Sequence, residues 1–466
     1  MANELLMYDN FIIDHEPATV SLDNKRLVWS HHVGSTTLAG DEHPVYVEND
    51  ESNDRKHTIG TDTIIGVDLE DYDNKNTVLT IRFIHASGDT EQLTVEKLQL
   101  CVHDDEECKT LLTWKNALQA VVLRESNDTR PKNLLIFVNP KAGKSKSVEI
   151  FENQLRPILQ SAGVSIDVII TEDETHANRV LSSYDLTGKD GIISMGGDGS
   201  FWQILSAYYQ RFVRDEGVNM DDMNGEFLQS TIPLGAIPGG TGCVLAEIAT
   251  GTKDPVTAVL HIIQGKWFDK GGALVHNGGI FYGISSLMVC IGYPYEVLRK
   301  SESFRVLGFP LRYIAASLTA LWQHKTASAV IEMCTQEDEV HDSIQTFHIN
   351  FVMFIMFLSD PDMKKDMMNW ATPKKQMSIF HFFGTRKQTF DTTLKMFLSS
   401  KVDVIAGDGG WYKCKSFKLT LQDDFDFEQD GITLDGEMKL LVSKEVHMKY
   451  VPKLFKMFGK CHPYLG

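Results

Sequence analysis

Three glycine-rich turns are the parts of this sequence best suited to chemistry. Glycine lets backbone amides approach a phosphate group closely, and a helix N-terminus favours an anion. Each turn follows an apolar run of strand type, and a segment with helical periodicity follows at least the first two. The turns are Asn139-Pro140-Lys141-Ala142-Gly143-Lys144-Ser145, Met195-Gly196-Gly197-Asp198-Gly199 and Ile237-Pro238-Gly239-Gly240-Thr241-Gly242-Cys243. Together they predict a site for nucleotide phosphates.

Charged side chains within the turns sharpen this prediction. Lys141 and Lys144 add point charges to the first turn, which is not a Walker A sequence and alone reads equally well as an ordinary strand–helix connection. Asp198 leaves a carboxylate at the mouth of the second turn. The alternative for Asp198 is a helix cap, because a side-chain oxygen can satisfy free amides there. Three such turns in order form a more specific pattern than any one of them.

The elements that must position these turns alternate between strand and helix from residue 133 onward. Apolar strand runs at 134–138, 164–171, 191–195 and 233–238 are separated by helical periodicity at 145–160, from 174, and at 201–212. This alternation predicts a largely parallel sheet with its ligand site at the carboxyl ends of the strands.

The flanking regions are strand-rich. Residues 1–125 alternate short apolar runs with acidic turns, and close with a helix that places Leu111, Trp114, Leu118 and Val121 on one face. Beyond residue 270, strand runs dominate and are broken by one helical stretch at 311–322. We therefore expect a multidomain chain: a small β-rich domain over 1–125, an α/β nucleotide-binding domain over 131–268, and a mainly β lobe over 269–466 whose final segment is free to return to the nucleotide-binding domain.

Composition excludes several classes of protein. The 466 residues are 42% hydrophobic and 23% charged, as in globular domains, and the net charge of −18 disfavours a nucleic-acid partner. Seven scattered cysteines predict neither a disulfide framework nor a zinc site. The longest apolar run, 351–358, is far shorter than the ~20 residues that span a bilayer, and the first residues lack a signal-peptide pattern. We expect a cytoplasmic protein that is neither secreted nor membrane-spanning.

Several motifs, taken in order, resemble the diacylglycerol kinase catalytic-domain superfamily of lipid kinases. The resemblance covers about residues 131–455, and within the superfamily ceramide kinases are most similar, with sphingosine kinases next. The ceramide kinase branch is favoured by Gly251-Thr252-Lys253-Asp254, by Gly292-Tyr293, and by an N-terminal domain of pleckstrin-homology type. The motifs common to the superfamily are residues 131–140, Thr171-Glu172 with His176-Ala177, Gly197-Asp198-Gly199, Gly240-Thr241-Gly242, residues 301–308 with Arg312-Tyr313, and Leu434-Asp435-Gly436-Glu437.

The resemblance implies a lipid kinase that uses ATP and Mg²⁺. Asp198 would be the general base for the lipid hydroxyl and, with Glu302, a metal ligand. Glu296 would contact the substrate. Sphingosine kinases are similar but carry a carboxylate four residues before Glu302, where this chain has Leu298, so ceramide is favoured over sphingosine. The residues implied to bind the nucleotide are Asn139, Lys141, Gly143, Lys144, Ser145, Thr171, His176, Gly197, Gly199, Gly240, Thr241, Gly242, Glu302, Arg305, Arg312, Asp435 and Glu437.

Departures from the family pattern keep alternatives open. Gln203 stands where relatives have glutamate, Cys243 where they have asparagine, and Pro373-Lys374-Lys375 where they have an aspartate-glycine pair. The alternatives are a sphingosine or diacylglycerol kinase, and a catalytically weak lipid- or nucleotide-binding protein. The expected partners are a sphingolipid substrate and, through residues 1–125, the surface of a membrane. The alternative for Glu296 is a solvated surface charge.

Overall fold

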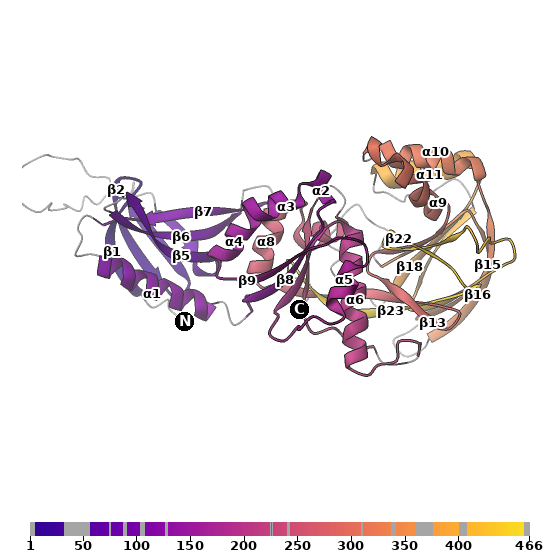
Figure 1. Ribbon diagram of the computed structural model, residues 1–466, viewed down its shortest axis with the longest axis horizontal. Coiled ribbons are helices and arrows are strands. Elements are labelled where there is room, and N and C mark those ends of the chain that lie inside the picture. The colour runs from indigo at the N-terminus through magenta and orange to yellow at the C-terminus, as the bar shows by residue number, and fades with distance from the viewer. Residues whose placement is uncertain are drawn as a thin grey trace, which may run out of the picture. The chain divides into compact units, whose positions relative to one another are not determined.

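The structure is a computed structural model (Figure 1). It describes residues 5–31, 56–73, 76–86, 91–102, 108–125, 129–223, 225, 227–239, 243–308, 311–336, 342–358, 376–399 and 408–460. The chain divides into two compact units. The first comprises residues 1–132, 152–166 and 259–266, and the second comprises 133–151, 167–258 and 267–466.

The first unit contains two antiparallel sheets and one long helix. β1 (Leu5–Ile13), β2 (Glu16–Asp23), β3 (Arg26–His31) and β4 (Lys56–Gly60) form one sheet in chain order. β5 (Ile64–Asp73), β6 (Asn76–Ala86) and β7 (Leu93–Leu100) form the other, and a bridge between Ile12 and Cys101 joins the two. The helix is α1 (Cys108–Glu125).

The apolar face predicted for this helix is confirmed. Leu111, Trp114, Leu118 and Val121 are all buried in the core of the unit. The Trp114 ring meets Phe11 edge to face at 5.3 Å, and its Nε1 donates a hydrogen bond to Asp9 Oδ2 at 3.2 Å. A buried indole N–H needs such a partner. Trp114 therefore fastens α1 to β1.

The α/β part of the second unit is built on β8 (Asn133–Val138), β9 (Ser165–Ile170), β10 (Gly191–Gly196) and β11 (Leu234–Pro238), in the order β11-β10-β8-β9. β10 pairs in parallel with both β8 and β11, as the alternating pattern predicted. β10 and β11 are buried along their whole length, because helices cover both faces of a parallel sheet.

The connecting helices include α5 (His176–Leu181), α6 (Asp198–Asp215), α7 (Val244–Thr250) and α8 (Pro255–Ile263). The helix predicted over 145–160 is divided into α2 (Ala142–Ser145), α3 (Ser147–Ile150), a π-helical turn (Phe151–Leu155) and α4 (Arg156–Ser161). Its first turn is distorted by positive φ angles described below.

The remainder of the second unit is mainly β, as predicted. A six-stranded sheet has the order β19-β18-β17-β14-β21-β22, and a larger sheet continues from the α/β part through β23, β20, β15 and β16. The strands are β12 (Trp267–Asn277), β13 (Ile280–Ser285), β14 (Met288–Gly292), β15 (Ala327–Gln336), β16 (Asp342–Phe351), β17 (Met353–Phe357), β18 (Met377–Phe383), β19 (Asp408–Cys414), β20 (Ser416–Leu421), β21 (Gly431–Leu434), β22 (Glu437–Leu440) and β23 (Glu445–Phe458). β23 pairs with β11 at Met457 and Leu234, so the last strand links the β part to the parallel strands.

The helical stretch expected at 311–322 is confirmed, but it belongs to a group of helices in this β part rather than standing alone. They are α9 (Tyr293–Ser301), a 3₁₀ segment η4 (Glu302–Leu307), α10 (Leu311–Gln323) and α11 (Arg386–Ser399). α9 is too short for a clear period, and α11 contains several residues of low helix propensity, such as threonine. Figure 1 shows α9, α10 and α11 gathered on one side of the β part. Among the described helices, none has both the length and the apolar composition that crossing a membrane requires.

Candidate active site

The three glycine turns meet at the carboxyl ends of β8, β10 and β11. The Gly239 N–H donates to the Gly196 carbonyl at 2.9 Å. A Cβ at position 239 would lie 2.9 Å from Ala142 Cβ and 3.1 Å from Gly196 Cα, so the three turns approach too closely for a side chain there. Gly240, Thr241 and Gly242, which complete the third turn, lie outside the described residues.

Asn139 ties the first turn to the second. Its Nδ2 donates to Ser200 Oγ at 2.8 Å, and its Oδ1 accepts from the Lys141 N–H at 3.0 Å. Its backbone N–H donates to the Met195 carbonyl, and its carbonyl accepts from Ser147 Oγ. The side chain that was predicted to border the phosphates is thus engaged in holding the two turns in register.

The backbone of the first turn is strained. Gly143, Lys144 and Ser145 have consecutive φ angles of 60°, 58° and 65°, in the left-handed region that costs non-glycine residues energy. Such strain persists where the surrounding structure imposes it and clusters at ligand sites. The side chains of Lys141, Lys144 and Lys146 are all exposed, so three cations surround the turn. Lys146 was not predicted, although it continues the lysine pattern of this turn.

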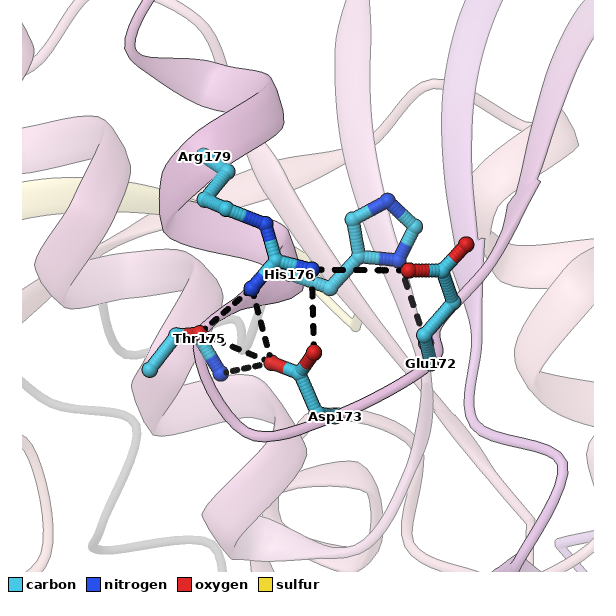
Figure 2. A network of polar contacts seen from close by, with 5 residues as sticks. All are labelled: Glu172, Asp173, Thr175, His176 and Arg179. Atoms are coloured by element: carbon cyan, nitrogen blue, oxygen red, sulfur yellow. Dashed lines mark hydrogen bonds and ion pairs between the residues drawn. The ribbon is translucent and has the colours of Figure 1, made fainter.

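The loop after β9 carries Thr171, and His176 begins α5; Figure 2 shows the polar network of this loop and helix start. Asp173 accepts from the Thr175 N–H at 2.8 Å and from both terminal nitrogens of Arg179 at 3.0 and 2.9 Å. The Arg179 guanidinium lowers the pKa of Asp173 well below its ordinary value. His176 Nδ1 accepts from the Glu172 N–H at 3.1 Å, so this ring nitrogen orders the loop.

Asp198 begins α6 and holds the start of α7. Its Oδ2 accepts from the Val244 N–H and its Oδ1 from the Leu245 N–H, both at 3.0 Å. Burial raises the pKa of the half-buried Asp198 carboxyl to about 6, against the lowering effect of these two amides, and the charge of Asp435 adds to the rise. A carboxylate has about four acceptor sites. Asp198 therefore caps a helix and keeps capacity to accept a proton near neutral pH.

Asp435 lies in the turn between β21 and β22, with a φ of 54°. It is buried and accepts five hydrogen bonds from the segment that joins β13 to β14. The donors are Ser285 Oγ (2.6 Å), Ser286 N (2.6 Å), Ser286 Oγ (2.7 Å), Leu287 N (2.9 Å) and Met288 N (3.0 Å). These five bonds occupy the acceptor capacity of the carboxylate, so Asp435 holds the segment between β13 and β14 in place.

Glu437 projects from β22 against the second glycine turn. A Cβ at Gly199 would collide with its Oε1, which places the Asp-Gly-Glu motif beside the Gly-Asp-Gly motif. Burial raises the pKa of Glu437, and the charges of Glu174 and Glu302 raise it further. The mouth of the site is therefore acidic as well as lined by lysines.

The acidic residues fit a magnesium ion that arrives with a nucleotide. Within the described ranges, no group of three or more His, Cys, Asp or Glu side chains is arranged to hold a metal by itself. Mg²⁺ does not need one, because it keeps several waters and binds through one or two carboxylates plus substrate phosphates. The charge of Glu302 reaches Glu437, and the pairing of Asp198 with Glu302 as metal ligands stays a prediction.

The helical segment after β14 was predicted to supply further phosphate and metal contacts. Glu302 begins η4, and the side chain of Arg305 lies outside the described atoms. Arg312 Nη2 donates to the Tyr313 hydroxyl at 2.5 Å, and its guanidinium lies 4.4 Å from the centre of the Tyr313 ring. Within the part of the chain that the structure describes, no hydrogen bond or ion pair joins Arg312 to the glycine turns. Its role at the phosphates stays a prediction.

Glu296 is not a solvated surface charge. It is 5% exposed and forms a bidentate pair with Arg299, with Oε1 at 3.0 Å from Nε and Oε2 at 2.8 Å from Nη2. With Tyr293 and Lys325 it lines a cavity of about 20 Å³, which has room for a water molecule. A substrate contact would therefore compete with Arg299 for this carboxylate.

Two of the three departures from the family pattern are Gln203, on the helix that Asp198 begins, and Cys243, at the N-cap of the helix that Asp198 caps. The third, residues 373–375, lies outside the described residues. Cys243 is buried at the N-cap of α7, directly before the two amides that Asp198 accepts. Burial raises the pKa of the Cys243 thiol to about 12, and the charge of Asp198 contributes. Cys243 is thus a neutral, inert neighbour. Gln203 lies one turn into α6 and is partly buried.

Residues 133–269 match the diacylglycerol kinase catalytic domain. The resemblance predicted from the motifs is confirmed. The chain is 29% identical to human ceramide kinase over 211 residues, which are 45% of this chain and 39% of the relative. It is 25% identical to ceramide kinase 1 of Caenorhabditis elegans over 381 residues, or 74% and 69% of the two chains. It is 30% identical to sphingoid long-chain bases kinase 1 of Arabidopsis thaliana over 194 residues, or 39% and 23%.

The match therefore spans well under half the length of the human ceramide kinase. A solved structure described as a candidate diacylglycerol kinase of Bacillus anthracis str. Sterne is also similar, with a TM-score of 0.50 and 17% sequence identity. That likeness covers 72% of this chain and 97% of the bacterial chain. At 17% identity this likeness supports the fold alone.

Proposed function

We propose that this chain is an ATP-dependent lipid kinase that transfers the γ-phosphate to the primary hydroxyl of ceramide, giving ceramide 1-phosphate. The observation that carries the proposal is Asp198. This half-buried carboxyl, with its pKa raised to about 6, lies where the three glycine turns meet. Two curated relatives named ceramide kinase, from human and nematode, support the choice of lipid.

In this mechanism, the first turn binds the phosphates through its backbone amides and the exposed Lys141, Lys144 and Lys146. Asp198 takes the proton from the lipid hydroxyl as the hydroxyl oxygen attacks the γ-phosphorus and ADP leaves. Phosphoryl transfer depends mainly on in-line positioning and on neutralising charge. Glu302 and Glu437 would hold a magnesium ion together with the phosphates, and that ion would supply part of the neutralisation.

The first unit is the proposed membrane module. Its seven strands and closing helix are typical of a pleckstrin-homology domain, and it holds none of the three glycine turns. In this proposal the protein is cytoplasmic and meets membranes peripherally, and this unit brings the kinase to its substrate without taking part in the chemistry.

The choice of ceramide rests on the position of the carboxylate. Glu296 can accept from a hydroxyl or amide N–H, whereas Leu298 cannot pair with the ammonium of sphingosine. The test compares kcat/KM on ceramide and sphingosine of matched chain length. We expect a ceramide preference in the wild type that falls by about tenfold in Glu296→Gln, the value of one charge-assisted hydrogen bond.

Arg299→Gln is the matched control, because it breaks the same ion pair but keeps the carboxylate. It should retain the ceramide preference. A clear preference of the wild type for sphingosine would contradict the ceramide assignment and leave a kinase for sphingoid bases. Phosphorylation of diacylglycerol above both would point instead to a diacylglycerol kinase.

A second candidate is a lipid- or nucleotide-binding protein with little activity. It is favoured by the two hydrogen bonds that make Asp198 a cap of α7, and by Gln203 in place of a carboxylate. Its signature would be ATP binding in calorimetry without transfer of labelled phosphate to ceramide, sphingosine or diacylglycerol in mixed micelles.

A further inference from the structure

Helix α10 has an apolar outer face. Its inner face packs through the small residues Ala316, Ser317 and Ala320, which are buried. Leu311, Leu318 and Trp322, spaced by seven and four residues, share the other face and are 56%, 54% and 83% exposed. The preceding η4 adds Val306 and Leu307, which are 99% and 49% exposed. We call these five residues the α10 apolar face.

Cations border this face. A groove of about 310 Å³ between α10 and α11 is lined by Leu318, Leu321, Trp322, Phe390, Arg386 and Lys387. No carboxylate is among these lining residues, although the chain has a net charge of −18. Arg386 Nη2 donates to the Trp322 carbonyl at 3.4 Å, which fastens the start of α11 to the end of α10. Figure 1 shows the two helices side by side.

The face is held firmly on the segment that carries the predicted substrate and metal residues. The Tyr293 hydroxyl donates to the Ser317 carbonyl at 2.8 Å, which joins α9 to α10. Tyr293, Val297, Ala316 and Ala320 share one core cluster beneath the face. Glu296 lies on α9 and Glu302 begins η4. A surface that binds the α10 apolar face is therefore brought next to these residues.

Single exposed apolar residues are common, but five on consecutive elements make an interaction surface. We propose that the α10 apolar face docks on a lipid bilayer that contains anionic headgroups. The apolar side chains enter the interfacial region, where tryptophan is favoured, and Arg386 and Lys387 contact the headgroups. This surface lies outside the first unit, so the protein would meet the membrane at two places. Its test needs binding only and does not rest on the proposed kinase activity.

The experiment measures binding of the full chain to vesicles of phosphatidylcholine, with and without phosphatidylserine. Leu318→Gln/Trp322→Gln keeps helix propensity and removes two apolar side chains, so affinity should fall by about tenfold or more. For Arg386→Gln/Lys387→Gln, affinity should fall by about tenfold for vesicles that contain phosphatidylserine and should be unchanged for vesicles of phosphatidylcholine only. The matched control is Ile344→Thr/Val442→Thr, which removes side chains that are 76% and 79% exposed on other elements and should bind as the wild type does.

A further variant guards against misfolding. Trp322→Phe retains an apolar ring, so it should bind vesicles normally yet lose the part of the tryptophan fluorescence that brominated lipid quenches. Wild-type binding by Leu318→Gln/Trp322→Gln would overturn the proposal and leave vesicle binding to other surfaces. The proposal would also be overturned if Leu318→Gln/Trp322→Gln bound vesicles normally but no longer self-associated in sedimentation velocity. That result would assign the face to contact with a second copy of the chain.

Discussion

The turn between β10 and α6 and the turn between β21 and β22 each present an aspartate beside a glycine, and the two aspartates differ in what surrounds them. Asp198 is half-buried and accepts two backbone amides. Asp435 is buried and accepts five donors. A carboxylate with free acceptor sites can take a proton, whereas one whose sites are filled holds its donors in place. Asp198 is therefore the candidate for chemistry, and Asp435 is the one that holds neighbouring segments in place.

Replacing Asp435 should give the largest loss of stability. In Asp435→Asn an amide NH₂ faces N–H and O–H donors, and each buried donor left without an acceptor costs about 1–3 kcal/mol. We expect the free energy of unfolding to fall by at least about 3 kcal/mol, measured by denaturant titration. Ser285→Ala removes one donor and keeps the carboxylate, so it should cost about 1 kcal/mol. Equal stability of Asp435→Asn and wild type would show that the Asp435 carboxylate does not hold the segment between β13 and β14 in place.

Gly239 and Gly199 test the packing of the glycine turns at two different contacts. In Gly239→Ala the new Cβ meets the Gly196 backbone, which cannot give way cheaply, so stability should fall by about 1–3 kcal/mol and ATP binding should weaken. In Gly199→Ala the Cβ meets only the flexible end of Glu437. That variant should fold normally but lose about tenfold in kcat through the displaced carboxylate. The reverse ranking in thermal melts would contradict the close approach of the turns.

Asp198 also predicts a dependence of rate on pH. The base works when deprotonated, and its pKa is raised to about 6. The value of kcat/KM should therefore be constant above that pH and fall about tenfold for each further unit of acidification. The residual rate of Asp198→Asn should lack this step. A step of the same size in that variant would assign the titration to another group.

Much of this site was predictable, because parallel strands bring their carboxyl ends to one edge. The turns at Asn139, Gly196 and Gly239 follow neighbouring strands, so their meeting follows from the alternation of strands and helices. The same reasoning located Asp198. It also offered helix capping as the alternative, and the structure shows capping of α7 by both oxygens.

Other features depend on contacts between residues far apart in the chain. Asp435 and Ser286 are 149 positions apart, and no local pattern tells that this carboxylate is saturated. The Glu296–Arg299 pair is local, but the burial of Glu296 depends on the packing of α9 against residues far away in the chain, such as Ala320 and Phe351. The sequence predicted a helix at 311–322 but not the exposure of the α10 apolar face, because periodicity shows that a face is apolar without showing what covers it.

The central claim is that Asp198 performs chemistry as well as capping α7. The direct measurement is transfer of labelled phosphate from ATP to ceramide in mixed micelles by wild type and Asp198→Asn, with unfolding followed in parallel. The asparagine carbonyl can still accept a hydrogen bond from one of the two backbone N–H groups, so the free energy of unfolding should fall by only about 1–3 kcal/mol. The account predicts efficient transfer by the wild type and a kcat lower by about 10²–10⁴ in the folded variant. A variant whose folded fraction transfers phosphate at the wild-type rate would contradict it and leave Asp198 as a helix cap.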